Sequence, residues 1–437
     1  MLLKQLFVPN VRRLSMSIDS LPKIETKNIS VGGWVYHVTK RGNLAFLKVG
    51  DGRTNQMIQI VASRELADNV QVGSSIKAVG KWKRSEGKGQ EMELEAEHFQ
   101  CLGNDKNPRY NISPDNLRKT LHLRARSTEF AALIRARSRI FQHTHQFFMN
   151  EEFVHIETPK LTMNDSEGGG EVFDVSTTTE NGNKEEEMKL TVSSQLHLEA
   201  MASRLSKVYT LGPAFRAEKQ QSRTHMSEFQ MLEAEVSFEN TVDEMCDLVQ
   251  KYVSSMIQLT FNDPKLSKDL ESMGTYCDQT TRIPKNQNEW PRITYDTAVK
   301  LLETNGQKVV AKSGLSRQNE LWLVDKHDRS PLFVTHFPSS QKPFYMARTE
   351  DGLNTESFDL LVPHIGELAG GSVRENDVEK LKERGCNIEW YLDLRMRGQA
   401  PSAGFGIGFD RLIQMLLGVK NIKDTVSFPR WYNHCQC

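Results

Sequence analysis

Three short segments of the chain combine residue types that suit the binding of a phosphorylated ligand. Residues 152–159 read EFVHIETP, residues 212–218 read GPAFRAE and lead to SEF at 227–229, and residues 404–412 read GFGIGFDRL. Arg216 and Arg411 each stand beside an apolar residue, so the packing of a strand or helix would hold the guanidinium in place. A rigid, permanently charged, planar fork is well matched to phosphate oxygens.

Other residues of these segments extend the same interpretation. Glu218 follows Arg216 by two residues, so on a strand both side chains would lie on one face, where a carboxylate can accept from an adenine amino group. The glycines before Arg411 let the backbone approach a ligand, but they do not form a Rossmann fingerprint. The sequence also contains no P-loop pattern. The alternative is that each arginine makes an internal salt bridge and the glycines serve turns; it weakens when all three segments occur together in this order.

The elements that must position these residues begin with a β-rich region between residues 28 and 103. Short apolar strands separated by Gly and Asp turns are expected at 31–35, 44–49, 57–61, 76–80 and 92–96. Five short strands with such turns predict a small barrel, and a barrel of this size is typical of the OB-fold.

The pattern changes after the barrel. Residues 104–118 are polar with two prolines and predict a hinge, which we place at 104–125. Apolar residues from Phe130 to Phe148 recur at helical spacing, and a short strand is expected at 153–156. A polar loop is expected at 176–188 and a helix at 241–260. The fold class is therefore α+β, with a second, larger domain over 126–437.

Composition limits the possible functions. The formal net charge is zero, with 26% charged residues, so any contact with nucleic acid must be a local patch rather than a basic coat. No apolar run is long enough to span a membrane, so no membrane partner is expected. The six cysteines form no CxxC pair, which argues against a structural zinc site and favours reduced thiols.

The first 18 residues form a basic, apolar leader without an acid. Lys4, Arg12 and Arg13 are interspersed with apolar residues at near-helical spacing, although Pro9 interrupts a regular helix. This composition is typical of a mitochondrial transit peptide and predicts the mitochondrial matrix. The alternative is a disordered basic extension on a cytoplasmic protein.

Taken together, the three segments resemble the three motifs of class II aminoacyl-tRNA synthetases. The chain from about residue 28 is similar to the aspartyl, asparaginyl and lysyl subgroup. The resemblance implies an anticodon-binding OB-fold before a catalytic domain built on an antiparallel sheet. It also implies a homodimer whose interface includes the first motif, which ends at Pro159.

The resemblance implies specific roles at the ATP site. Arg216 would bind the α-phosphate and Arg411 the γ-phosphate, which makes them the catalytic residues. Glu218 would contact adenine, Phe229 would stack on it, and His225 would complete the ATP site. One departure concerns the loop between Glu218 and Phe229, where Arg223 stands one residue earlier than the arginine of the family pattern. Its contact with phosphate is therefore left open.

A metal site is implied by the same resemblance. Residues 358–367, FDLLVPHIGE, look like the magnesium-binding stretch, with Asp359 and Glu367 as ligands. Carboxylate oxygens are the donors expected for a Mg²⁺ ion that bridges phosphates. The alternative for these two residues is a pair of solvated surface acids.

The residues expected around the amino acid favour asparagine. Glu167, in a loop that closes over the substrate, would face its ammonium group, and Gln195 is a further member of the amino-acid site. Arg374 would hold the side-chain oxygen that asparagine and aspartate share. Leu198 stands where aspartyl enzymes carry a lysine, and Glu233 would accept from an amide NH₂ and repel a carboxylate.

The expected activity is thus the joining of asparagine to tRNA(Asn) with ATP, through an asparaginyl-adenylate. The alternatives are an aspartyl-tRNA synthetase and an ammonia-dependent asparagine synthetase, which shares the catalytic fold but has no use for the barrel. In the barrel, Phe46 and Gln59 match positions that contact anticodon bases in the subgroup. For Phe46, the alternative is ordinary core packing.

Overall fold

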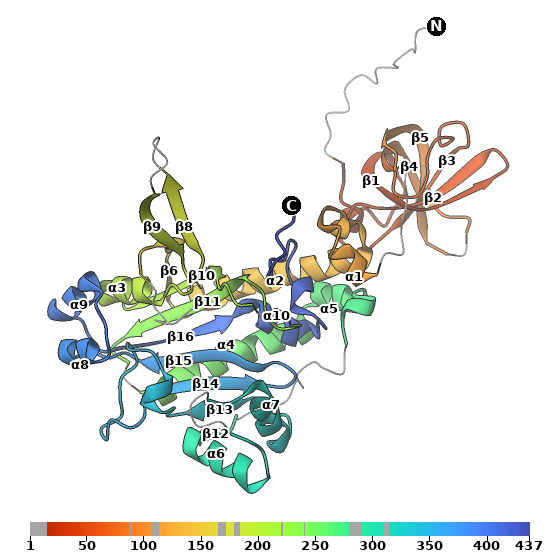
Figure 1. Cartoon of the computed structure of the whole chain (residues 1–437). Coiled ribbons are helices and arrows are strands. Elements are labelled where there is room, and N and C mark those ends of the chain that lie inside the picture. The colour runs from red at the N-terminus through yellow and green to blue at the C-terminus, as the bar shows by residue number, and fades with distance from the viewer. Residues whose placement is uncertain are drawn as a thin grey trace. The chain divides into compact units, whose positions relative to one another are not determined.

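The structure is a computed structural model that describes residues 15–437, apart from 88, 106–112, 165–171, 179–183, 220–221, 240, 279–289 and 310–313 (Figure 1). Its contacts divide the chain into two compact units. The first contains residues up to Ser113 and Ala125–Ala132, and the second contains Pro114–Arg124 and Leu133–Cys437. Within the described residues, no helix is both long and apolar enough to cross a membrane.

The first unit is a closed five-stranded barrel in the order β1-β2-β3-β5-β4. The strands are β1 (Thr26–Arg41), β2 (Leu44–Gly50), β3 (Ile58–Ser63), β4 (Ser75–Arg84) and β5 (Met92–Gly103). The predicted barrel is confirmed, and every strand extends beyond its predicted bounds. Alternate residues such as Leu47, Ile60 and Leu94 are fully buried and form its core, as strand pleating requires.

The end of the predicted leader is part of this barrel. The Met16 N–H donates to the Ser30 carbonyl at 3.0 Å, and the Ile18 N–H donates to Asp51 Oδ2 at 2.9 Å. Ile18 is 4% exposed and packs in the barrel core. The rest of the predicted leader, residues 1–14, lies outside the described residues.

The second unit is built on an eight-stranded sheet in the order β12-β13-β14-β15-β16-β11-β10-β6. Its strands are β6 (Val154–His155), β10 (Lys207–Phe215), β11 (Glu228–Ser237), β12 (Arg292–Thr294), β13 (Leu332–Thr335), β14 (Ser357–Val362), β15 (Gly366–Val373) and β16 (Ser402–Gly408). The strands from β13 to β10 are antiparallel, as expected. The short edge strands β12 and β6 run parallel to their neighbours, so the sheet as a whole is mixed.

Helices surround this sheet. They are α2 (Thr128–Asn150), α3 (Gln195–Leu205), α4 (Val242–Asn262), α5 (Pro264–Glu271), α6 (Tyr295–Thr304), α7 (Arg317–Lys326), α8 (Val378–Glu383), α9 (Glu389–Met396) and α10 (Phe409–Leu417). The expected helices from Phe130 and over 241–260 are confirmed as α2 and α4. A capping box between Thr241 and Glu244 begins α4, which packs against β14, β15 and β16. The α3 helix packs on β10 and β11.

One expectation about a loop is wrong. The stretch expected as a polar loop contains the hairpin of β8 (Asp174–Thr178) and β9 (Lys184–Leu190), which pairs with β7 (Leu161–Thr162). Asp174 and Ser176 are exposed, so the hairpin lacks the apolar alternation that reveals a half-buried strand.

The hinge predicted at 104–125 falls where the chain passes between the two units, and its role as a hinge stays a prediction. Short helices form there at α1 (Pro114–Leu117) and η2 (Leu121–Arg126), and both Leu117 and Leu121 are buried. Arg118 and Arg124 form ion pairs with Asp424 near the C-terminus. These packed residues belong to the catalytic unit.

Candidate active site

Two adjoining cavities lie over the central strands of the sheet. The larger has a volume of about 550 Å³ and the smaller a volume of about 120 Å³. Arg216, Met231, Glu367 and Gly406 line both cavities, so a ligand can extend from one into the other. Met231 and Glu233 reach the cavities from β11, while Leu232 between them is fully buried on the other face.

The smaller cavity brings together every residue predicted to bind ATP. Its lining includes Arg216, Glu218, His225, Phe229, Glu367 and Arg411. These residues come from the end of β10, the loop that follows it, β11, β15 and α10. Segments almost 200 residues apart in the sequence thus form one surface, of a size suited to part of a nucleotide.

Arg216 lies just beyond the end of β10. Its N–H donates to the Ser227 carbonyl at 2.9 Å, and its Cζ lies 5.7 Å from the centroid of the Phe229 ring. Its Nη1 is 4.0 Å from Glu218 Oε1. The strand β10 ends at Phe215, so Arg216 and Glu218 lie just beyond it, and their side chains are close together without sharing a strand.

Asp410 connects the start of α10 to the sheet and to α2. It is buried at the start of α10 and accepts from the Gln230 N–H of β11 at 2.8 Å. It also forms an ion pair with Arg137 of α2. The next residue, Arg411, donates from Nη1 to the Glu367 carbonyl at 2.8 Å. One buried carboxylate therefore ties α10 to β11 and to α2, next to the residue, Arg411, that reaches the cavity.

The loop with the shifted arginine is ordered around His225. Its Nδ1 lies 2.5 Å from Ser222 Oγ, and burial together with the nearby Arg411 charge lowers the pKa of His225. The Arg223 carbonyl accepts from the Ile422 N–H at 2.9 Å, while the Arg223 side chain is exposed. The backbone is thus anchored, and contact of Arg223 with phosphate stays a prediction.

The two predicted metal ligands converge above Gly370. A Cβ placed on that glycine would lie 3.2 Å from Asp359 Oδ1 and 3.6 Å from Glu367 Oε1, so a glycine leaves room between the two carboxylates. Lys342 Nζ lies 2.8 and 3.0 Å from the two Asp359 oxygens. Burial raises the pKa of Asp359 to about 6, against the opposing effect of Lys342.

A third carboxylate, which sequence reasoning missed, stands behind this pair. Glu320 of α7 accepts from the Glu367 N–H at 3.0 Å, and burial together with Glu367 raises its pKa to about 7. No local motif in the sequence marks it. Among the described residues, no group of three or more His, Cys, Asp or Glu is arranged to hold a metal ion. The two converging carboxylates fit a cation that takes its remaining ligands from phosphates and water.

The larger cavity contains the residues predicted for the amino acid. Gln195, Glu233 and Arg374 line it together with Leu198. Glu167 lies outside the described residues. Leu198 is 1% exposed and presents an apolar side chain, so no cation reaches the cavity from position 198.

Glu233 is held in place by the start of α3. Its Oε1 accepts from Ser193 Oγ, and both carboxylate oxygens lie 3.0 Å from the Ser194 N–H. Lys160 was missed, although it directly follows Pro159 of the first motif. Burial lowers the pKa of Lys160, and the Glu233 carboxylate opposes that effect, so a cation does lie near Glu233.

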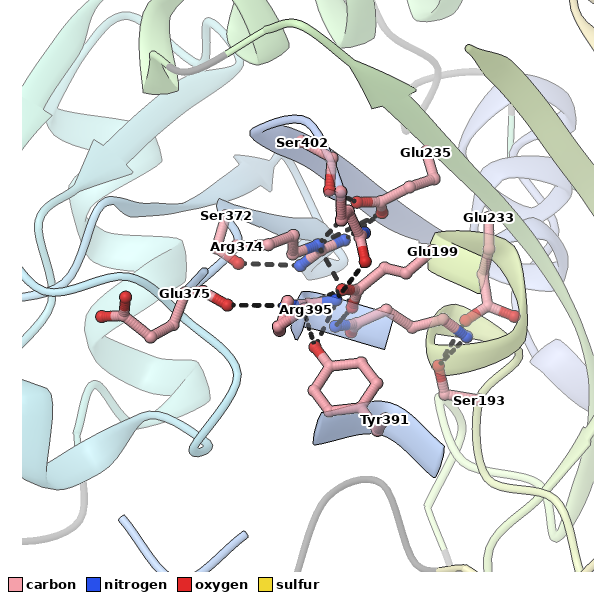
Figure 2. A network of polar contacts seen from close by, with 12 residues as sticks. Ser193, Glu199, Glu233, Glu235, Ser372, Arg374, Glu375, Tyr391, Arg395 and Ser402 are labelled. Carbon is pink, nitrogen blue, oxygen red and sulfur yellow. Dashed lines mark hydrogen bonds and ion pairs between the residues drawn. The ribbon is translucent and has the colours of Figure 1, made fainter. Parts of the chain in front are cut away.

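Arg374 is almost fully buried beneath the larger cavity, where it is 5% exposed (Figure 2). Its Nη2 lies 2.8 Å from Glu235 Oε2, its Nε donates to the same carboxylate, and its Nη1 donates to Ser372 Oγ at 2.7 Å. Glu235 was missed. Its signal was its position two residues after Glu233, which places both on one face of β11.

The two barrel residues lie on its outer surface. Phe46 alternates with the buried Ala45 and Leu47 and is itself partly exposed, so the core-packing alternative is wrong. Gln59 pairs with Lys48 on the neighbouring strand and donates from Nε2 to Glu93 Oε2 at 2.9 Å. Both side chains therefore point away from the barrel core, where an aromatic ring can stack on a base.

Comparisons with known proteins agree with this geometry. Residues 114–432 match the family described as "tRNA synthetases class II (D, K and N)", and residues 29–102 match "OB-fold nucleic acid binding domain". The mouse asparaginyl-tRNA synthetase is 37% identical over 93% of this chain and 91% of its own length. A Dictyostelium discoideum protein described as "Probable asparagine--tRNA ligase, mitochondrial" is 35% identical over 94% of both chains.

Solved structures give the same result. The asparaginyl-tRNA synthetase of Pyrococcus horikoshii complexed with asparaginyl-adenylate superposes with a TM-score of 0.86 at 28% identity. The match covers 97% of this chain and 99% of that one. The similarity therefore includes both the barrel and the catalytic unit.

Proposed function

The chain belongs to the class II tRNA synthetases of the D, K and N group, and from this premise we propose that it is an asparagine–tRNA ligase. It converts ATP, asparagine and tRNA(Asn) into asparaginyl-tRNA, AMP and pyrophosphate. The observation that carries the proposal is the larger cavity, which offers Arg374 and Glu233 to a side chain and has Leu198 in place of a cation. Arg374 can donate to the oxygen of a side-chain amide, and Glu233 can accept from its nitrogen.

The reaction has two steps. A carboxylate oxygen of asparagine attacks the α-phosphorus of ATP, the bond from the α-phosphorus to the α,β-bridging oxygen breaks, and pyrophosphate leaves while the asparaginyl-adenylate stays bound. A ribose hydroxyl at the tRNA end then attacks the activated carbonyl, and AMP leaves. The chain need only align the reactants and stabilise charge on phosphate, so no nucleophilic side chain is required.

The residues of the smaller cavity have defined roles in the first step. Arg216 lies where the two cavities meet and holds the α-phosphate, and Arg411 reaches the γ-phosphate. Phe229 stacks on adenine and Glu218 accepts from its amino group. His225, held by its neighbours in the loop, completes the phosphate surface.

Class II synthetases use ATP with a divalent metal, and we propose Mg²⁺ held by Asp359 and Glu367. The support is their convergence above Gly370 next to the cavity wall. Such an ion would neutralise charge on the departing phosphates. Lys342, which is bonded to Asp359, supplies a protein cation at the same place.

The amino-acid side chain is selected at the floor and wall of the larger cavity. Arg374 donates to the side-chain oxygen, and Glu233 accepts from the amide nitrogen. Gln195 contacts the backbone end of asparagine, and Glu167 receives its ammonium group. Aspartate would bring its second carboxylate oxygen against Glu233, and that like-charge contact in a poorly solvated cavity is unfavourable.

The tRNA, the second subunit and the compartment complete the proposal. Phe46 and Gln59 contact anticodon bases from the barrel surface.

Two chains associate through the first motif around Pro159, and light scattering on the full chain would show a dimer rather than a monomer. Residues 1–18 direct the protein to the mitochondrial matrix, and a reporter carrying them that stays in the cytoplasm would contradict this.

The direct test is amino-acid-dependent ATP–pyrophosphate exchange with asparagine, aspartate and lysine. Asparagine is expected to support the fastest exchange, and preference for aspartate would favour an aspartyl-tRNA synthetase instead. An ammonia-dependent asparagine synthetase is excluded if label from asparagine appears in tRNA. Formation of free asparagine from aspartate without RNA would support it.

A further inference from the structure

Glu199 lies beneath the larger cavity and contacts two of the residues that line it. It is fully buried on α3, one helical turn after Gln195. Its Oε1 accepts from Gln195 Nε2 at 3.0 Å and lies 3.8 Å from Arg374 Nε. A single carboxylate oxygen therefore contacts both the residue expected at the backbone end of the substrate and the residue expected at its side chain.

The other oxygen of Glu199 faces α9 (Figure 2). Its Oε2 accepts from the Tyr391 hydroxyl at 2.8 Å and forms a buried ion pair with Arg395. Arg395 is in turn fixed by the Glu375 carbonyl, which accepts from its Nε at 3.0 Å, and by Gln399. Residues that line the cavity therefore hold one oxygen of Glu199, and residues of α9 hold the other.

The formal charges in this buried cluster cancel, although burial raises the pKa of Glu235 to about 7. Glu199 and Glu235 are the two acids, and Arg374 and Arg395 are the two bases. Burial would lower the pKa of Arg374, but Glu235, Glu199 and Tyr345 together outweigh burial and raise it. An unpaired buried charge is strongly unfavourable, so each acid requires its arginine.

The glycine beside the cluster shows how tightly Arg374 is placed. A Cβ on Gly404 would lie 2.0 Å from Glu235 Oε2 and 2.6 Å from Arg374 Nη2. Any side chain at that position would displace the pair. The floor of the cavity is therefore a packed and electrically balanced layer rather than a loose set of side chains.

From this balance we infer that Glu199 is a positioning residue that makes the cavity select a neutral amide over a carboxylate. It cancels the charge of Arg395 below Arg374, so the cavity floor carries no surplus positive charge to attract aspartate. It also fixes Gln195, because a carboxylate only accepts hydrogen bonds and so holds the amide nitrogen of Gln195 toward itself. The inference rests on the proposed function, since it concerns which amino acid that same cavity accepts.

The test compares two substitutions that separate charge from shape. Glu199→Gln keeps the length of the side chain and removes its charge, whereas Glu199→Asp keeps the charge and shortens it. We would measure kcat/KM for asparagine and aspartate in pyrophosphate exchange. Glu199→Gln is expected to lower the asparagine-to-aspartate ratio on the order of tenfold, because two arginines then face one carboxylate. Glu199→Asp is expected to lower both values and leave the ratio unchanged.

Arg395→Gln changes the charge of the cluster in the opposite direction to Glu199→Gln. It removes a positive charge from the same cluster, so the ratio should stay the same or rise while the overall rate falls. Circular dichroism and thermal unfolding establish that each variant is folded. A folded Glu199→Gln enzyme with the wild-type ratio overturns the inference, and so does a ratio that falls equally in Arg395→Gln.

Two further outcomes are also decisive. If Glu199→Gln does not fold, Arg395→Gln alone decides: a lowered ratio overturns the inference and an unchanged or raised ratio supports it. A wild-type enzyme that itself prefers aspartate contradicts the proposed function instead, and this is visible before any substitution is made.

Discussion

The two cavities of the active site are built in different ways. In the larger cavity, Arg374 is 5% exposed and its guanidinium is bonded to Glu235 and Ser372. In the smaller cavity, the Arg216 side chain is 33% exposed, and the Glu218 carboxylate lies 4.0 Å from it. The larger cavity, which we propose for the amino acid, is thus assembled by contacts within the protein, whereas the smaller cavity, which we propose for ATP, has a more accessible arginine.

This difference has a physical reason. ATP brings its own charges, so arginines at the ATP cavity gain their ion pairs when the nucleotide binds. Asparagine brings a neutral side chain, so the charge of Arg374 must be balanced by the protein itself. A preorganised donor in a buried layer also discriminates between ligands that are nearly identical in shape.

The largest expected effect is that of Arg374→Ala. It removes the donor for the side-chain oxygen and leaves Glu235 buried without its main partner. Breaking a buried pair in this way typically costs about 3–5 kcal/mol, so both asparagine activation and the free energy of unfolding should fall. Denaturant unfolding and pyrophosphate exchange measure the two losses. A variant that lost activity but kept wild-type stability would show that the floor is not held by this pair.

Arg216→Ala should affect activity alone. Loss of one preorganised charge contact typically reduces the rate by roughly 10²–10³-fold. Because the Arg216 side chain is partly exposed, denaturant unfolding should give the wild-type stability. Near-normal exchange by the folded variant would remove Arg216 from the α-phosphate.

Phe46→Ala is expected to have the smallest effect and to leave both cavities intact. One stacked base is worth roughly 1–3 kcal/mol, so kcat/KM for tRNA should fall while exchange without tRNA stays at the wild-type rate. Lys48→Ala on the same strand removes a charge but no aromatic ring, so it is the control that separates loss of stacking from loss of charge. An equal fall in tRNA-independent exchange would make Phe46 a structural residue.

The comparison also explains what the sequence could predict. The ATP residues occur in short motifs, so Arg216, Glu218, Phe229 and Arg411 were identified together, and the structure places them around one cavity. The barrel was predictable because its core residues alternate with exposed ones along each strand.

The supporting residues of the larger cavity were not predictable in this way. Arg374 pairs with Glu235, which is 139 positions away, and Arg395 pairs with Glu199, which is 196 positions away. No local pattern marks such partners, because each is an ordinary charged residue until the sheet and α9 bring them together. The hairpin of β8 and β9 was missed for a different reason, since residues 176–188 are almost all polar and show no apolar alternation in the sequence.

We propose that charge at the larger cavity, rather than its shape, selects asparagine over aspartate. The most direct measurement is the asparagine-to-aspartate ratio of kcat/KM in pyrophosphate exchange for the wild-type enzyme and for Glu233→Gln. Gln is close in size to Glu but carries no charge and can donate as well as accept. The account predicts a wild-type preference for asparagine that falls markedly in the variant. A folded Glu233→Gln enzyme that kept the wild-type ratio would contradict it.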